Sequence, residues 1–251
     1  METKENLDSI KGFEPISSDQ MYQIENNGEN EFSMKKILMM ENAGSRIADF
    51  VISEFGDTIL NKSIIAVCGK GNNGGDALVA MRHLSGYILA KNLSEKPPQL
   101  AVILLCSPND LKTSEAISNW KIIEKIDSIK TYTMKSCTLE DIKERIKTSD
   151  IILDGIFGTG IKGDINEPYS SIISFINTRK GNSYVLSVDI PSGLNPDTGE
   201  IKDKTIIADT TITFHRPKHG HFNNGASVIG KLIVKKIGIP FETERGVVNK
   251  N

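Results

Sequence analysis

Residues 64–76 read Ile-Ile-Ala-Val-Cys-Gly-Lys-Gly-Asn-Asn-Gly-Gly-Asp, an apolar strand pattern that runs into a glycine-rich turn. The residues that follow, Ala77 to Leu89, have the pattern of a helix. A strand, a glycine-rich turn and a helix in this order are typical of nucleotide-binding α/β folds. This stretch therefore predicts the fold class, while the side chains of its turn restrict the function.

The turn satisfies the dinucleotide-binding pattern GxGxxG, with glycines at positions 69, 71 and 74. A pyrophosphate needs bare backbone N–H groups at a helix N-terminus, and Asp76 would place a carboxylate beside the phosphates. Asn72, Asn73 and Asp76 instead offer oxygen ligands to a hard cation and hydrogen-bonding groups to a polar ligand. Alternatively, Asp76 only caps a helix that begins at Ala77. Capping does not account for the two asparagines and four glycines.

The composition is that of an ordinary globular α/β domain. The chain has 251 residues, 38% of them hydrophobic and 25% charged, with a formal net charge of -2. This charge disfavours nucleic acid as a partner. There is no secretory signal pattern at the N-terminus, and no apolar run approaches the roughly 20 residues of a membrane span. Three cysteines without CxxC spacing indicate reduced thiols, so we expect a cytoplasmic protein.

Apolar runs alternate with helical patterns along the chain. We expect strands at residues 63–68, 100–106, 129–134, 151–154, 184–189 and 210–214. Near the N-terminus, Ser17-Ser18-Asp19 is expected to cap one helix and Ser33 to open a longer one. Near-continuous apolar strands separated by helices predict a mostly parallel sheet with helices on both faces. The expected fold is a single three-layer α/β/α, Rossmann-like domain over residues 1–251.

Two further predicted strands end on an aspartate and continue into a polar loop. One loop reads Asp154-Gly-Ile-Phe-Gly-Thr-Gly-Ile-Lys-Gly-Asp164, and the other begins Val188-Asp-Ile-Pro-Ser-Gly193. In open α/β sheets, ligands bind outside the carboxyl ends of the strands. Ordinary turn chemistry could account for either loop alone. Three such clusters at the same sheet edge favour a binding site.

In their order and spacing, the three clusters resemble the NAD(P)H-hydrate epimerase family, also called the YjeF N-terminal domain family. Further matching segments are Met40-Glu-Asn-Ala-Gly44, Thr213-Phe214 with Pro217-Lys218, and Gly238-Ile-Pro240, so that the resemblance covers roughly residues 16–241. Enzymes of that family interconvert the R and S epimers of the hydrates of NADH and NADPH, called NADHX and NADPHX. A separate dehydratase then restores the cofactor. The resemblance implies an isomerase of metabolite repair, without the dehydratase domain that some members carry.

The resemblance also implies a cation site and a catalytic pair. One potassium ion per subunit would be held by Asn73, Asp154 and Ser192, whose oxygen atoms suit a hard cation, although residue types alone do not separate potassium from sodium or a divalent ion. Asp189 is the candidate general acid/base, and Lys162 would lower its pKa or stabilise developing negative charge. Lys162 could instead be an exposed lysine that only contacts phosphate. Independently, Asp189 could orient the ligand while Asp76 or a water molecule moves the proton. The implied substrate-binding residues are Asn72, Asn73, Gly74, Gly75, Asp76, Gly158, Thr159, Gly160, Ile161, Lys162, Gly163, Asp164 and Asp189.

Other interpretations remain at this stage. The fold is reused in non-catalytic proteins, an mRNA-decapping scaffold and an apolipoprotein-binding protein, but the candidate ion and acid/base residues are all present here. A nicotinamide dehydrogenase needs an acidic residue at the end of the next strand, whereas Glu95 precedes that strand. His215, His219 and His221 suggest zinc, but they lack an acidic or cysteine partner at ligand spacing. A homodimer is the family expectation, and the preference between NADHX and NADPHX stays open.

Overall fold

The computed structural model describes residues 13–91, 98–160, 164–201 and 204–248. In this part of the chain, seven strands form one sheet in the order β3-β2-β1-β4-β5-β6-β7, and every neighbouring pair is parallel. The strands are β1 (Ile64–Cys68), β2 (Leu100–Leu104), β3 (Ile129–Thr133), β4 (Ile151–Gly155), β5 (Tyr184–Val188), β6 (Thr210–Phe214) and β7 (Lys231–Lys235).

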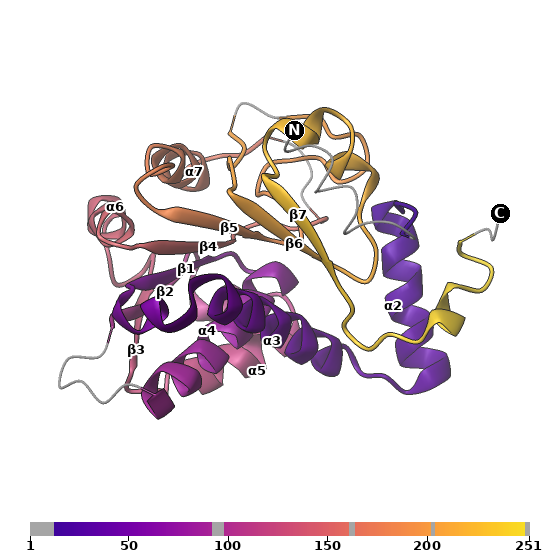
Figure 1. Cartoon of the computed structure of the whole chain (residues 1–251), viewed down its shortest axis with the longest axis horizontal. Coiled ribbons are helices and arrows are strands. Elements are labelled where there is room, and N and C mark those ends of the chain that lie inside the picture. The colour runs from indigo at the N-terminus through magenta and orange to yellow at the C-terminus, as the bar shows by residue number, and fades with distance from the viewer. Residues whose placement is uncertain (1–12, 92–97, 161–163, 202–203, 249–251) are drawn as a thin grey trace.

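Helices cover both faces of the sheet (Figure 1). One face carries α3 (Lys36–Phe55), α4 (Asn72–Lys91) and α5 (Ser114–Ile123), and the other carries α6 (Leu139–Lys147) and α7 (Tyr169–Asn177). Helix α2 (Ser18–Phe32) lies outside these layers, beside the C-terminal segment (Figure 1). Short 3-10 turns complete the described part: η1 (Gly56–Asn61), η2 (Pro108–Asp110), η3 (His219–His221), η4 (Asn224–Ser227) and η5 (Phe241–Glu244). None of the helices in the described ranges is long and apolar enough to cross a membrane.

The alternation of side chains along β1 explains its unbroken apolar sequence. Ile64, Ala66 and Cys68 lie in the core under α3, α4 and α5. Ile65 and Val67 lie in the separate core under α6 and α7. Successive side chains of a strand point to opposite faces, so a strand covered on both faces has no solvent-facing position.

The expected three-layer α/β/α fold with a parallel sheet is confirmed. All six expected strands are present, and their ends differ from the expected ranges by at most two residues. The sequence analysis did not identify the edge strand β7, which begins and ends with lysine. Charged residues and short length are common on edge strands because they block pairing with further strands, and they also weaken the apolar signal.

Two helix starts differ from the expectation. Helix α4 begins at Asn72 instead of Ala77, so Asp76 lies inside the helix and is not its N-cap. A Cβ atom on Gly69 would lie 1.8 Å from the carbonyl oxygen of Ile156, and one on Gly74 would lie 2.3 Å from the carbonyl oxygen of Gly69. These two glycines therefore permit a close backbone approach that lets the helix start almost directly after β1.

The two N-terminal serines have different roles. The Ser17 side chain accepts a hydrogen bond from the backbone N–H of Gln20, as expected of the residue that caps α2. Ser33 was expected to open the next helix, but it ends α2 in a left-handed conformation with φ of 57°. Its backbone N–H donates to the carbonyl oxygen of Gly28, and α3 begins only at Lys36.

Helix α3 packs against α4 through a glycine, which gives a test of this packing. A Cβ atom on Gly44 would lie 2.3 Å from Cβ of Val79 and 2.7 Å from the carbonyl oxygen of Asp76. We expect Gly44→Ala to lower the free energy of unfolding by about 1–3 kcal/mol, because the two helices must separate. The control is Gly86→Ala on the open face of α4, where a Cβ meets nothing within 4 Å and should stabilise by about 0.5–1 kcal/mol. Urea unfolding measures both, and equal effects would contradict the assigned packing.

Candidate active site

A pocket of about 500 Å³ lies at the carboxyl end of the sheet. Its walls come from the turn after β1, the loop after β4, the residue after β5 and the segment after β6, with α2 and α3 on the remaining side. The chain turns from β1 towards β2 on one side and from β4 towards β5 on the other, so β1 and β4 form the switch point at which open sheets bind ligands.

The structure brings most of the predicted substrate-binding residues to this pocket. Its lining includes Asn72, Asn73, Asp76, Gly158, Thr159, Gly160 and Asp189. Gly74 and Gly75 are buried within α4 and do not line it, because their position serves helix packing. Asp164 is exposed and also lies outside the lining. Ile161, Lys162 and Gly163 fall outside the described residues.

Asp189 leaves β5 through a tight reverse turn. Its φ of 60° is left-handed, and the N–H of Ile190 donates to the carbonyl oxygen of Val188 at 2.7 Å. The N–H of Asp189 donates to the carbonyl oxygen of Ile212 in β6 at 2.7 Å. The carbonyl oxygen of Asp189 lies 3.0 Å from Nε2 of His221. Left-handed backbone is uncommon for residues other than glycine and persists where surrounding contacts fix it, often at functional sites.

Lys218 and Thr213 hold the Asp189 side chain. The Lys218 ammonium is 1% exposed and donates to Oδ1 of Asp189 at 2.5 Å, and the Thr213 hydroxyl donates to the same oxygen at 2.8 Å. Burial by itself raises the pKa of the Asp189 carboxyl, but the charge and hydrogen bond of Lys218 outweigh it, so that the pKa lies below its ordinary value. Asp189 is thus a carboxylate at neutral pH.

His221 completes the support of Asp189 as a neutral side chain. Its Nδ1 accepts the backbone N–H of Lys218 at 3.0 Å, so Nε2 carries the proton and donates to the carbonyl oxygen of Asp189. Burial and the Lys218 charge lower the pKa of His221 to about 4. The imidazole therefore fixes the Asp189 backbone without adding positive charge.

The lysine paired with Asp189 is not the one proposed from the sequence. Lys218 follows β6 in the segment Pro217-Lys218, which supported the family resemblance but was not assigned to the site. Sequence distance hid the pair, because 29 residues separate Lys218 from Asp189 and only the β5–β6 pairing brings them together. The role proposed for Lys162 stays a prediction.

Two more carboxyl groups line the pocket, Glu25 from α2 and Asp76 from α4. Burial raises the pKa of Glu25 to about 7, with Asp189 raising it further while Lys218 and Lys36 lower it. Burial also raises the pKa of Asp76 well above its ordinary value, and the charges of Asp189 and Glu25 add to this. Glu25 was missed by the sequence analysis because it follows no strand.

Asn73, Asp154 and Ser192, the predicted cation ligands, lie in one buried hydrogen-bond network. The Asn73 amide donates to the carbonyl oxygens of Phe157 and Val188, both at 2.9 Å. The Phe157 N–H donates to the Ser192 hydroxyl at 2.9 Å, and the hydroxyl and N–H of Ser192 donate to Asp154. The structure therefore gathers the three residues from α4, β4 and the loop after β5.

The donor chemistry of this network fits a hard cation. Asp154 is fully buried, and it makes no ion pair within the described ranges. Burial raises the pKa of its carboxyl although Ser192 lowers it, so a positive counter-charge would favour the ionised form. A Cβ atom on Gly158 would lie only 3.1 Å from Oδ1 of Asn73, so the glycine keeps that amide oxygen uncovered.

The three histidines considered for zinc are dispersed. His221 supports Asp189 as described, His219 is exposed, and His215 is fully buried beside Glu244. No group of three or more His, Cys, Asp or Glu side chains able to hold a metal ion is present in the described ranges. Within the described residues, Lys218 is the member of the segment 215–221 that lines the pocket. His215 and His221 make hydrogen bonds behind the pocket wall.

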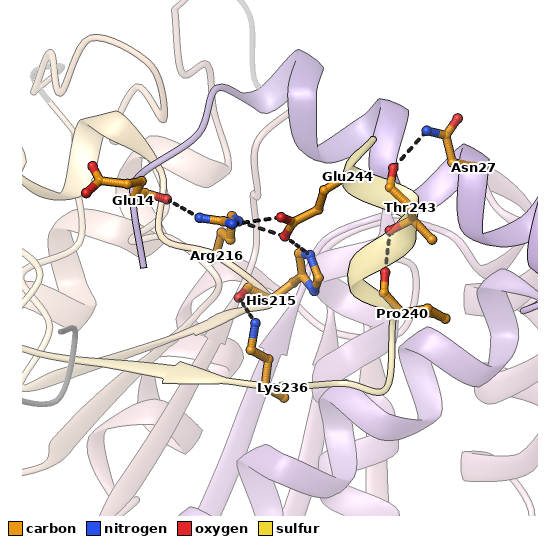
Figure 2. A network of polar contacts seen from close by, with 8 residues as sticks. All are labelled: Glu14, Asn27, His215, Arg216, Lys236, Pro240, Thr243 and Glu244. Carbon is orange, nitrogen blue, oxygen red and sulfur yellow. Dashed lines mark hydrogen bonds and ion pairs between the residues drawn. The ribbon is translucent and has the colours of Figure 1, made fainter. Parts of the chain in front are cut away.

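The C-terminal turn η5 links α2 to the segment after β6 (Figure 2). Glu244 forms a two-point ion pair with Arg216 at 2.7 Å for both contacts, and it also accepts from Nε2 of His215 at 2.8 Å. On the other side of the turn, the Asn27 amide of α2 donates to the carbonyl oxygen of Thr243 at 2.8 Å. We call Glu244, Arg216, His215, Thr243 and Asn27 the C-terminal clamp.

Comparison with known proteins shows which family this chain resembles. The model of the family described as YjeF-related protein N-terminus matches residues 36–220. The chain is 42% identical over 233 residues to proteins named NAD(P)H-hydrate epimerase from Nitrosopumilus maritimus and Cenarchaeum symbiosum, covering 93% of this chain and 99% of each relative.

Two further comparisons concern a longer protein and the fold. The bifunctional NAD(P)H-hydrate repair enzyme Nnr of Methanothermobacter thermautotrophicus is 35% identical over 205 residues, which are 82% of this chain but 37% of that relative. The crystal structure of yeast YNL200c matches with a TM-score of 0.75 over 94% of both chains at 20% identity. This structural match supports the fold alone.

The ion pair between Lys218 and Asp189 predicts the response of stability to pH. The lowered pKa of Asp189 contributes stability above its unfolded-state pKa of about 3.9, and this contribution is lost as pH falls through the folded-state pKa. Lys218→Met leaves a buried charge unpaired, so we expect a loss of about 3–5 kcal/mol at neutral pH that shrinks as Asp189 becomes protonated. Urea unfolding at several pH values measures this. The control Lys143→Met removes a surface pair with Glu140 and should cost less than about 1 kcal/mol.

The C-terminal clamp predicts a link between η5 and α2. Glu244→Gln removes the charge that pairs with Arg216, and we expect about 1–3 kcal/mol of destabilisation together with faster hydrogen exchange of the α2 amides. The matched control is Glu242→Gln on the same turn, which is exposed and should change stability by less than about 0.5 kcal/mol. Unchanged exchange in α2 for Glu244→Gln would show that the clamp does not hold this helix.

Proposed function

The chain belongs to the family of YjeF-related N-terminal domains, and from this membership we propose that the pocket described above is where the hydrates of NADH and NADPH are epimerised. The protein is an isomerase of this family, which interconverts the R and S epimers of NADHX and NADPHX. The observation that carries the assignment of the site is the Asp189 carboxylate, kept ionised by Lys218 and Thr213 within a pocket of about 500 Å³.

The reaction needs proton transfer at a single oxygen atom. The reacting carbon bears a hydroxyl group and is bonded to the ring nitrogen. Its configuration changes when the hydroxyl is lost, or the ring opens, and the bond then re-forms on the other face. Asp189 is the group we assign to this proton transfer, because its carboxylate is ionised and Lys218 and Thr213 hold one of its oxygen atoms. His221 holds the backbone carbonyl oxygen of the same residue. Lys218 keeps it ionised and stabilises negative charge that develops nearby.

Asn73, Asp154 and Ser192 are proposed as ligands of a potassium ion. The support is a fully buried carboxylate, a hydroxyl and an uncovered amide oxygen in one network. When bound, the ion supplies fixed positive charge that offsets Asp154 and stabilises the loops after β4 and β5. The choice of potassium among hard cations rests on the family resemblance.

The remainder of a dinucleotide has space next to the pocket. A second hollow of about 500 Å³ lies over the ends of β2 and β3, with walls that include Met134, Tyr169 and Asp110. Lys70 lines both hollows. We propose that the hydrated nicotinamide occupies the pocket with Asp189, that Lys70 contacts the pyrophosphate, and that the adenosine half lies in the second hollow.

Partners and location are proposed on coarser grounds. Relatives that combine this domain with further sequence are named bifunctional NAD(P)H-hydrate repair enzymes, which supports a separate dehydratase acting on the product of this chain. We also propose that the chain forms a homodimer, which is the assembly that the family resemblance implies. A cytoplasmic location is proposed because Cys68 and Cys106 are buried free thiols, which persist in reducing compartments.

The alternative function is a non-catalytic scaffold on the same fold. Such a scaffold would not need a buried, ionised carboxylate such as that of Asp189 in its pocket. Asp189 makes an ion pair with a buried lysine while still lining the cavity. Strongly perturbed ionisable groups in a cleft are typical of catalytic sites. The site therefore favours an enzyme.

The test is the epimerisation rate on chirally separated NADHX and NADPHX. We expect the protein to accelerate interconversion above the spontaneous rate, and Asp189→Asn to lower kcat by about 10²–10⁴-fold while substrate still binds. The control is Asp49→Asn, an exposed aspartate in α3 paired with Arg46, which should keep full activity. Replacing potassium by a large organic cation should weaken activity. Absence of acceleration by the intact protein, with nucleotide bound, would move it to the non-catalytic class.

A further inference from the structure

Glu25 places a third carboxyl group in the pocket, from an element that carries none of the sequence motifs. It lies on α2, between the fully buried Ile24 and the buried Gly28. Gly28 packs closely on α3, because a Cβ there would lie 2.9 Å from Cε of Met39. The position of Glu25 at the pocket wall is therefore fixed by packing and by the C-terminal clamp.

Glu25 has no structural task that would explain a carboxyl group at this position. It makes no hydrogen bond and no ion pair within the described ranges, and neither does the Asp76 side chain. A partly buried carboxyl group without a hydrogen-bond partner costs free energy. Such groups persist in a cavity where a ligand or the reaction uses them.

The charged groups that act on Glu25 come from α3, from α4 and from the segments after β5 and β6. Asp76 of α4 and Asp189 after β5 carry carboxyl groups, while Lys218 after β6 and Lys36 of α3 carry positive charge. Lys218 is already committed to Asp189 through a direct hydrogen bond. Glu25 therefore lies near an ionised carboxylate without a cation of its own in direct contact.

This environment separates the protonation states of the three carboxyl groups. The pKa of Asp189 is lowered despite burial, because Lys218 contacts it directly. Burial raises the pKa of Asp76 well above its ordinary value. Burial raises the pKa of Glu25 to about 7, where a group both releases and takes up protons readily. Carboxyl pairs with separated pKa values are the usual basis for distinct acid and base roles.

On the basis of the proposed function, we propose that Glu25 is a second catalytic acid/base, which acts on the substrate hydroxyl from the α2 side of the pocket while Asp189 acts from the sheet side. Protonated Glu25 donates its proton to the hydroxyl oxygen at the carbon next to the ring nitrogen. The C–O bond breaks, the nitrogen lone pair forms a C=N bond, and water leaves.

The second half of the reaction restores the carbinolamine on the other face. A water molecule adds to the carbon, the C=N electron pair returns to nitrogen, and the Asp189 carboxylate accepts the proton that this water loses. One water molecule has left and one has entered, and one proton has passed from Glu25 to Asp189. Exchange with solvent resets both groups, because Asp189 has the lower pKa and Glu25 the higher. The reverse conversion uses the same steps in the opposite order.

The pH profile distinguishes this role from a structural one. The active form carries one proton on the pair, so kcat/KM should fall as pH rises through about 7, where Glu25 loses its proton. Glu25→Gln should lower kcat by about 10²–10⁴-fold with little change in KM, and should remove this limb of the profile. Glu25→Asp should restore part of the rate together with the limb. Epimerisation in ¹⁸O-labelled water should incorporate label at the hydroxyl.

The controls separate failure of this inference from failure of the proposed function. Glu29→Gln changes a carboxylate one turn further along α2 that pairs with Lys35 at 3.9 Å, and it should keep wild-type kinetics. Thermal unfolding should show that each variant is folded. Wild-type rate and pH profile in Glu25→Gln would overturn the role of Glu25, as would epimerisation without label incorporation, which indicates ring opening. No acceleration by the intact protein would instead refute the proposed function itself.

Discussion

The buried ion pair between Lys218 and Asp189 is the interaction on which the site depends. The ammonium group is almost fully removed from water, and it can be tolerated there only because a carboxylate and the Thr213 hydroxyl satisfy it. The same contact keeps Asp189 ionised in surroundings that would otherwise protonate it. Asp189 in turn needs a left-handed backbone, which His221 and the β5–β6 ladder support. Charge state and backbone geometry are thus fixed together.

Around this pair, burial and neighbouring charges shift the pKa values of the carboxyl groups that line the pocket in different directions. Three carboxyl groups and one directly paired ammonium share the cavity, so full ionisation of all three would be strongly unfavourable. The pKa values of the three groups are accordingly separated, with that of Asp189 lowered, that of Glu25 raised to about 7 and that of Asp76 raised well above its ordinary value. The C-terminal clamp links α2, the helix that carries Glu25, to the segment after β6 (Figure 2).

The sequence predicted those site residues that follow strands directly. Asp154 lies at the end of β4 and Asp189 directly follows β5, while Asn73 in the first turn of α4 and Ser192 lie a few residues beyond β1 and β5. A parallel sheet brings such positions to one edge. The same reasoning predicted too late a start for α4, because glycines at its beginning resemble a turn. Only the structure shows why glycine is needed at positions 69 and 74. A Cβ atom at either position would collide with a backbone carbonyl oxygen.

The sequence by itself determined the layered parallel fold, the edge of the sheet where the pocket lies, and the residues that resemble the family pattern. These properties depend on periodicity and on local spacing, which a linear chain displays directly. The tertiary structure alone decided that Lys218 is the partner of Asp189 and that Glu25 enters the pocket. Both residues are distant in sequence from Asp189. Glu25 lies on a helix that precedes the first strand, and Lys218 follows β6. Their chemistry arises from burial and from neighbouring charges, which exist only once the chain has folded.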